Sequence, residues 1–161
     1  MSQIGGHAED ARGTGPVEPG RVVALDLGAR RIGVAYSDSR RTLASPWGTV
    51  ERSGDPARDQ KAVVEVIVEI EARAVVVGLP LSLSGANGPA AQAALRQVAT
   101  LRQALEPLGI TVETADERFT TVEAQRSLTA AGRKGRAARS VIDRAAAMVL
   151  LQAWLDGRAQ A

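Results

Sequence analysis

The stretch VVALDLGARRIGVAYSD, Val22 to Asp38, decides the fold because it contains two strand-like runs joined by a tight turn. The first run is apolar and has Asp26 near its end, and the second begins at Arg31, shortly after Gly28. Strand interiors are poor in aspartate. We therefore expect Asp26 either to form the turn together with Gly28 or to face a functional site.

Working outward from this stretch, the strand pattern continues on both sides. RVVALDL (21–27), RIGVAYSD (31–38) and TLASPWGTV (42–50) have short connections, which predict an antiparallel meander. AVVVGLP (74–80) is continuously apolar, as expected for a strand buried on both faces, and ITVETAD (110–116) predicts a fifth strand.

Helical patterns alternate with the later strands. One is predicted over 54–73 with Pro56 in its first turn, and a second over 88–109 from Pro89 to a terminating Gly109. Two more are predicted over 120–132, which opens with a capping box, and over 140–156. A meander followed by βα units predicts an α/β fold, in which helices flank a mixed five-stranded sheet.

Length and composition bound the class of protein. The 161 residues suit one domain, and we expect 1–20, rich in Gly and Pro, to be a disordered lead-in to a folded domain over 21–158. The chain has no cysteine, which excludes disulfides and thiolate zinc sites. It has no apolar run near the roughly 18 residues of a membrane span, so we expect a soluble, cytoplasmic protein without a membrane partner.

Acidic residues mark three predicted element ends. Asp26 closes the first strand, where ligands gather in such sheets. Asp116 and Glu117 end the fifth strand, and because strand side chains alternate, only one of them is expected to enter a common site. Asp143 would follow a helix cap at Ser140, where a carboxylate also has a purely structural use.

Taken together, these carboxylates favour a divalent-cation site. Oxygen ligands from two strand ends and one helix start can surround a hard cation such as Mg²⁺. Two such ions roughly 4 Å apart can promote phosphodiester cleavage. The sequence therefore indicates metal-dependent chemistry on a phosphodiester.

Four segments carry a resemblance to a known family: VALDLGARRIGVAYSD, VVVGLPLSLSG, ADERFTTVEAQRSL and VIDRAAAMVLLQAWLD. In this order, from about Arg21 to Asp156, they resemble the YqgF/RuvX family of Holliday-junction resolvases. The resemblance implies an RNase H-like fold and a nuclease dependent on Mg²⁺ or Mn²⁺. It also implies a role in resolving branched DNA or in maturing the 5′ end of pre-16S rRNA. By motif position, the family's acidic residues correspond to Asp26, to the Asp116/Glu117 pair with Glu117 preferred, and to Asp143.

Basic residues support a polyanionic partner. Between Arg118 and Arg144 they outnumber acids, and GRKGRAAR (132–139) predicts a basic loop, although a solvated loop joining two helices would look the same. Aromatic residues are scarce, so base stacking is not expected. The predicted nucleic-acid contacts are Arg30, Arg31, Arg118, Arg133, Lys134, Arg136 and Arg139.

Alternative functions remain open at this point. GLPLSLSGANGP (78–89) is either a plain turn or a phosphate contact, and it lacks the lysine of a Walker loop. The first motif also resembles the phosphate loop of actin-like ATPases, which need a second domain of comparable size. The stronger alternative is a non-catalytic nucleic-acid or ribosome-assembly binding module with the same fold. Symmetric cutting of a junction would favour a homodimer.

Overall fold

The computed structural model describes residues 19–79, 88–116 and 136–159 of the chain, and within 136–143 only the backbone. The predicted helix over 120–132 and most of the predicted disordered segment lie outside these residues. No helix in the described ranges is both long and apolar enough to cross a bilayer.

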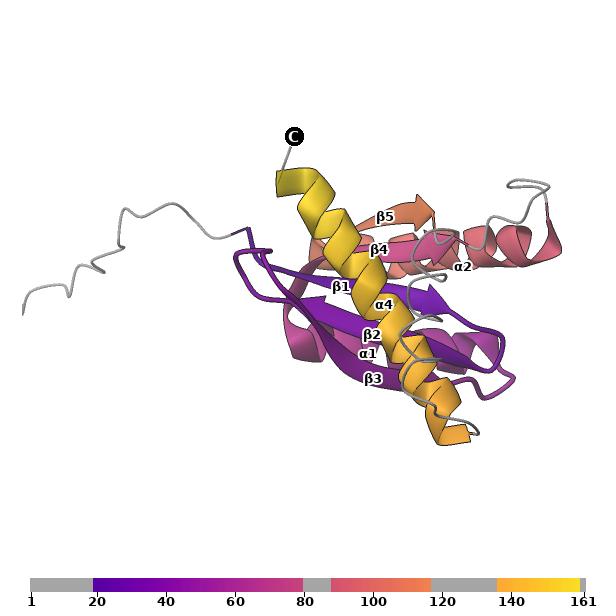
Figure 1. Cartoon of the computed structure of the whole chain (residues 1–161). Helices are drawn as coiled ribbons and strands as arrows, with labels where there is room; N and C mark the ends of the chain where they lie inside the picture. Colours follow the sequence, from indigo (N-terminus) through magenta and orange to yellow (C-terminus); the bar gives the residue numbers. More distant parts are fainter. Residues whose placement is uncertain (1–18, 80–87, 117–135, 160–161) are drawn as a thin grey trace, which may run out of the picture.

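Five strands form one mixed sheet (Figure 1). Its order is β3-β2-β1-β4-β5, with β1 paired antiparallel to β2 and parallel to β4. The pairs β2–β3 and β4–β5 are antiparallel and parallel, respectively. This arrangement confirms the predicted meander and the predicted mixed five-stranded sheet. The strands are β1 (Arg21–Leu27), β2 (Arg31–Ser37), β3 (Ala44–Glu51), β4 (Ala72–Leu79) and β5 (Thr111–Asp116).

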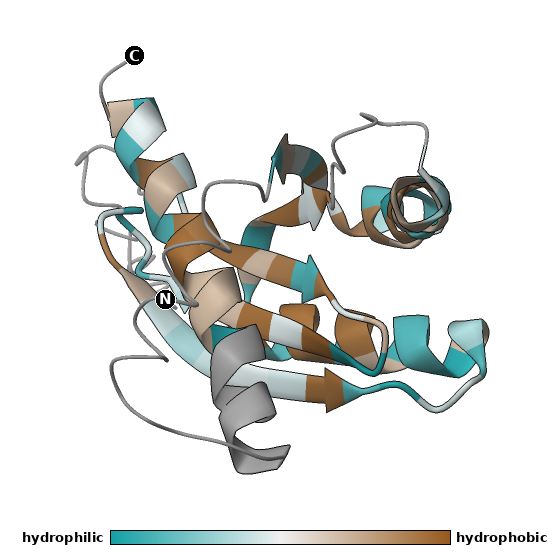
Figure 2. Ribbon diagram, turned by 45° about the vertical axis from the view of Figure 1, so that its right-hand side comes forward, coloured by the Kyte–Doolittle hydropathy of each residue, from teal (hydrophilic) through white to brown (hydrophobic). Residues whose placement is uncertain are grey.

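Helices cover both faces of the sheet. α1 (Pro56–Ile70) and α2 (Pro89–Leu105) lie on one face, and α4 (Arg136–Ala159) crosses β1, β2 and β3 on the other (Figure 1). Strand β1 is apolar along its buried length because alternate residues enter different cores (Figure 2). Val23 and Leu25 pack with α1 and α2, whereas Val22 and Ala24 pack with α4.

Local capping explains where the first two helices begin and end. The Asp55 side chain accepts a hydrogen bond from the Ala57 amide at 3.0 Å, and Pro56 occupies the first turn of α1. The helix ends at Ile70 and is capped by Glu71, which adopts a left-handed conformation (φ 63°). The second helix was predicted to continue to Gly109, but α2 ends at Leu105 and tightens into a 3₁₀ turn, Glu106–Leu108. This turn contains Pro107, whose ring has no amide to continue the helical ladder.

Two predicted boundaries are wrong for physical reasons. β3 begins at Ala44 rather than Thr42, because the Asp38 carboxylate binds the Thr42 amide and hydroxyl at 2.7 and 2.6 Å. The last helix begins at Arg136 rather than Ser140. The segment from Arg136 to Arg139 contains only alanine and arginine, which are strong helix formers.

Candidate functional site

Asp26 lies near the carboxyl end of β1, in a row of small residues. Across the sheet it is in register with Gly33 of β2 and Gly78 of β4, and Gly78 is in register with Ala115 of β5. Val22 and Ala24 pack against α4, so strand alternation places Asp26 on this same face. The flanking glycines have no side chains, so these two strand neighbours place no side chain beside the half-buried carboxylate.

The acid pair at the end of β5 is divided by the same alternation. Asp116 is in register with Leu79, which packs with the core under α1 and α2. Asp116 is therefore on the opposite face from Asp26, and it has an interaction partner of its own. Glu117 lies outside the described residues. The expectation that only one of the two acids enters a common site stays a prediction.

The backbone of Asp143 belongs to α4. Because the helix begins at Arg136, the prediction that Ser140 caps it is wrong, and its first turn contains no acid. Asp143 therefore does not serve as a carboxylate that stabilises the N-terminus of this helix. Asp143 precedes the fully buried Ala147 by about one helical turn, and Ala147 packs against the sheet face that carries Asp26.

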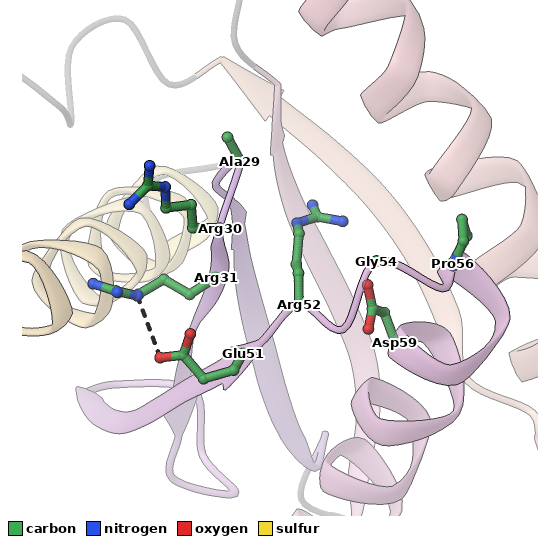
Figure 3. Close-up of a pocket in the computed structure, with 8 residues that line it drawn as sticks. All are labelled: Ala29, Arg30, Arg31, Glu51, Arg52, Gly54, Pro56 and Asp59. Carbon is green, nitrogen blue, oxygen red and sulfur yellow. Dashed lines mark ion pairs between the residues drawn. The ribbon is translucent and has the colours of Figure 1, made fainter.

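The turn between β1 and β2 follows Asp26 directly. The Gly28 amide donates to the Asp26 carbonyl oxygen at 3.0 Å. A Cβ atom at Gly28 would lie 2.5 Å from the Arg31 carbonyl oxygen, so only glycine fits this turn. Arg30 is exposed at its tip, whereas Arg31 is only 6% exposed and pairs with Glu51 at 3.4 Å (Figure 3).

Arg52, just after β3, connects the β1–β2 turn to α2 through hydrogen bonds. Its Nε donates to the Gly28 carbonyl oxygen at 2.6 Å, and a terminal nitrogen donates to Gln97 Oε1 on α2 at 3.2 Å. The Arg52 amide also donates to the Arg30 carbonyl oxygen at 2.9 Å. Sequence reasoning missed this residue, since one arginine after a strand carries no motif and its partners are distant in the chain.

A pocket of about 650 Å³ opens beside this turn, here called the turn pocket (Figure 3). Arg52 stands in its centre. Asp59, only 5% exposed, accepts hydrogen bonds from the Ser53 hydroxyl and amide at 2.7 and 2.8 Å, and these bonds lower the pKa of its carboxyl group. The pocket is lined by Ala29, Arg30, Arg31, Glu51, Arg52, Gly54, Pro56 and Asp59.

The other predicted basic contacts are only partly described. Arg118, Arg133 and Lys134 lie outside the described residues. Arg136 and Arg139 were predicted in a loop, but their backbone forms the start of α4, so the prediction is wrong for 136–139.

A metal centre can be tested against the donors that are described. Among the side chains that the structure describes, which include neither Glu117 nor Asp143, no three acidic or histidine residues gather closely enough to hold an ion. The described donor, Asp26, is a half-buried carboxylate flanked in the sheet by two glycines, and its oxygen atoms suit a hard cation such as Mg²⁺. No described histidine or cysteine competes for this position.

The order of the mixed sheet and the helices on both faces define an RNase H-like protein. Among solved structures, T. thermophilus RuvC in complex with Holliday junction substrate has a TM-score of 0.55 at 15% identity, and the alignment covers 86% of this chain and 95% of that one. The yeast mitochondrial Holliday junction resolvase has a TM-score of 0.57 at 11% identity, with 90% and 82% covered. At these identities the likeness establishes the fold.

Sequence comparison establishes the family. The family model described as RuvX, Holliday junction resolvase, matches residues 20–157, and this chain belongs to that family. A Rhodococcus erythropolis relative is 46% identical, with 88% of this chain and 81% of its own length covered. A Mycobacterium relative is 42% identical, with 92% and 87% covered. Both relatives are provisionally named pre-16S rRNA nucleases. The family is one of hydrolases that act on phosphodiester bonds in nucleic acid.

Proposed function

We propose that this chain is a metal-dependent nuclease that cleaves structured RNA, with the 5′ end of pre-16S rRNA as its substrate. The observation that carries the proposal is the row Gly33, Asp26, Gly78 and Ala115 at the carboxyl end of the parallel strands. A carboxylate whose strand neighbours lack large side chains would let a cation and a phosphate group approach it. The names of the relatives supply the substrate.

The proposed ligands are Asp26, Glu117 and Asp143. The register of Asp116 with Leu79 supports Glu117 as the ligand from β5, because the next residue in an alternating strand faces the other way. The position of Asp143 one turn before Ala147 supports its approach to the face that carries Asp26. Asp116 becomes the weaker candidate.

The proposed cofactor is Mg²⁺ or Mn²⁺, held by these three carboxylates. When bound, the ion supplies Lewis acidity that stabilises charge developing on phosphate oxygens. The chain itself provides the fixed negative charge of Asp26 and the space left by Gly33 and Gly78. Arg30, exposed at the tip of the turn, provides a cation for the phosphate backbone.

Resolution of branched DNA is the second proposed activity, and the family description favours it. Symmetric cutting of a junction needs two active sites, so this activity would require a homodimer. Processing of pre-rRNA has no such requirement, and it would place the protein in the cytoplasm, where bacterial ribosomes are assembled.

The decisive experiment compares wild type with Asp26→Asn, which keeps the side-chain size and removes the charge. Cleavage is measured with Mg²⁺, Mn²⁺ or chelator on a precursor-rRNA 5′ fragment and on a four-way DNA junction. We expect wild type to cut in the presence of metal and the variant to lose on the order of 100-fold or more of its activity. Binding of the substrate should be largely retained.

Two further variants assign the ligand from β5. Glu117→Gln should lose activity as Asp26→Asn does, while Asp116→Asn should keep most of it. Unchanged cleavage by Asp26→Asn would refute the assignment of the site. If wild type binds both substrates but cuts neither, the chain is the binding module that the sequence left as the alternative.

A further inference from the structure

A second hollow shares Arg52 and Pro56 with the turn pocket. It lies on the face of the sheet opposite to the one that carries Asp26. It has a volume of about 810 Å³ between α1 and α2, and we call it the α1–α2 groove. A smaller hollow of about 350 Å³, beside Gly28 and the first turns of α2, shares lining residues with both. Arg52 lines all three hollows. The groove is lined by Arg52, Pro56, Ala57, Gln60, Ala93, Arg96, Gln97, Thr100, Gln103 and Ala104.

The electrostatics of this path are positive. No acidic residue lines the α1–α2 groove, and no described carboxylate pairs with the exposed Arg96. In the turn pocket Glu51 pairs with Arg31, and Asp59, which accepts hydrogen bonds from Ser53, also interacts electrostatically with Arg52. Four arginines line the two hollows against these two carboxylates, so the path keeps a net positive charge.

The hydrogen bonds of Arg52 neither neutralise its guanidinium nor use all of its N–H donors. The two partners of its guanidinium, the carbonyl of Gly28 and the side-chain amide of Gln97, are neutral. A guanidinium has five N–H donors, and these two bonds leave others for an anion. A cation held by neutral acceptors is a preorganised site for phosphate.

The remaining lining of the groove suits a sugar–phosphate backbone better than bases. Gln60, Gln103 and Thr100 offer polar side chains, while Ala93 and Ala104 leave room for a chain to approach the helices. No aromatic residue lines the groove, so base stacking is absent there. Contacts to phosphate and sugar are independent of sequence.

We propose that the α1–α2 groove holds the sugar–phosphate backbone of the single strand that flanks the cleaved bond. This inference rests on the proposed nuclease function and extends it. The strand would leave Asp26 on the α4 face, cross the carboxyl edge of the sheet at Arg30 and Arg52, and continue along Arg96. The protein then binds its substrate on both faces of the sheet.

The test measures binding rather than cleavage. Fluorescence anisotropy without metal gives the affinity of the full chain for labelled oligouridylates of increasing length, with oligodeoxythymidylates as a second series. The variant is Arg96→Gln, an exposed change on α2, and the matched control is Arg73→Gln. Arg73 is also exposed but lies at the opposite end of the parallel strands, at the start of β4.

We expect Arg96→Gln to bind long strands roughly 3- to 10-fold more weakly at low salt and to bind the shortest strands as wild type does. Its salt slope on long strands should fall by about 0.7, the contribution of one phosphate contact on a single strand. Arg73→Gln should match wild type. Similar losses for RNA and DNA would support recognition of the shared backbone.

Three outcomes would overturn the inference. Wild-type affinity of Arg96→Gln for long strands would do so, as would an equal loss in Arg73→Gln or a loss that does not grow with strand length. Because binding needs no catalysis, failure of the nuclease function is separable. If wild type cuts no substrate but Arg96→Gln loses affinity in a length-dependent way, the α1–α2 groove is supported as a binding site and the nuclease function is not.

Discussion

At the scale of single residues, the surroundings of Asp26 are set by neighbours that have no side chain. Gly33 and Gly78 flank it in the sheet. The sequence predicted an unusual aspartate near a strand end and a meander that contains Gly33, but it could not indicate Gly78 as a neighbour. Register between strands depends on pairing over long separations in the chain, and no local pattern around Asp26 contains Gly78.

Asp38 shows how one carboxylate sets a strand boundary and a pH dependence. It accepts hydrogen bonds from the Thr42 hydroxyl and amide and from the Leu43 amide, and these bonds, led by the hydroxyl, lower its pKa from 3.8 to about 2. Because the folded pKa lies below the unfolded one, the stabilisation is complete above pH 4 and is lost as the pH falls from 3.8 through 2.

We therefore expect Asp38→Ala to lower the free energy of unfolding by about 1 kcal/mol near neutral pH. The difference from wild type should shrink as the pH falls below 4. Urea unfolding at pH 7 and at pH 3 measures both effects. Thr42→Val, which removes only the hydroxyl donor, should show part of the loss at pH 7. A difference that is constant with pH would contradict this account.

At the scale of elements, the backbone at the end of α1 is strained because a residue other than glycine adopts a left-handed conformation there. Glu71 adopts φ 63° and donates its amide to the Ile67 carbonyl oxygen, a position where glycine is usual. We expect Glu71→Gly to raise the free energy of unfolding by about 0.5 to 1 kcal/mol, since glycine has no Cβ to clash. Chemical denaturation of the purified variant measures this gain.

Arg41 is the matched control for this change. It has a similar φ of 60°, but its side chain donates to the carbonyl oxygens of Gly20 and Pro19 at 2.8 and 3.1 Å. Arg41→Gly should therefore show no gain, because relief of backbone strain is offset by lost hydrogen bonds. A gain in both variants would mean that side-chain contacts at Arg41 contribute nothing.

Most elements were predictable because their signals are local. Apolar runs gave the five strands, and Pro56 and Pro89 marked the starts of the first two helices. The start of α4 was misplaced, since Ser140 is a good cap by residue type but the residues before it also form helix. Arg52 was missed because its role depends on tertiary contacts with Gly28 and Gln97.

At the scale of the whole molecule, net charge is a poor guide to binding. The chain carries only +2, yet its arginines are unevenly distributed. We expect replacement of Arg133, Lys134 and Arg136 by alanine to weaken binding of nucleic acid and to flatten its salt dependence, since each phosphate contact adds to the slope. Anisotropy titrations over a range of salt measure this slope. An unaltered slope would mean that these residues serve only to connect helices.

The hydrogen bonds from Arg41 to Pro19 and Gly20 also have a practical meaning for assays. They fix the point where the chain enters β1, at the end of the strand away from Asp26. Asp26 follows Gly20 by six positions, so at about 3.3 Å per strand residue the two are roughly 20 Å apart. A tether attached where the chain enters β1 would therefore hold the carboxyl edge away from a sensor surface and leave the substrate path open.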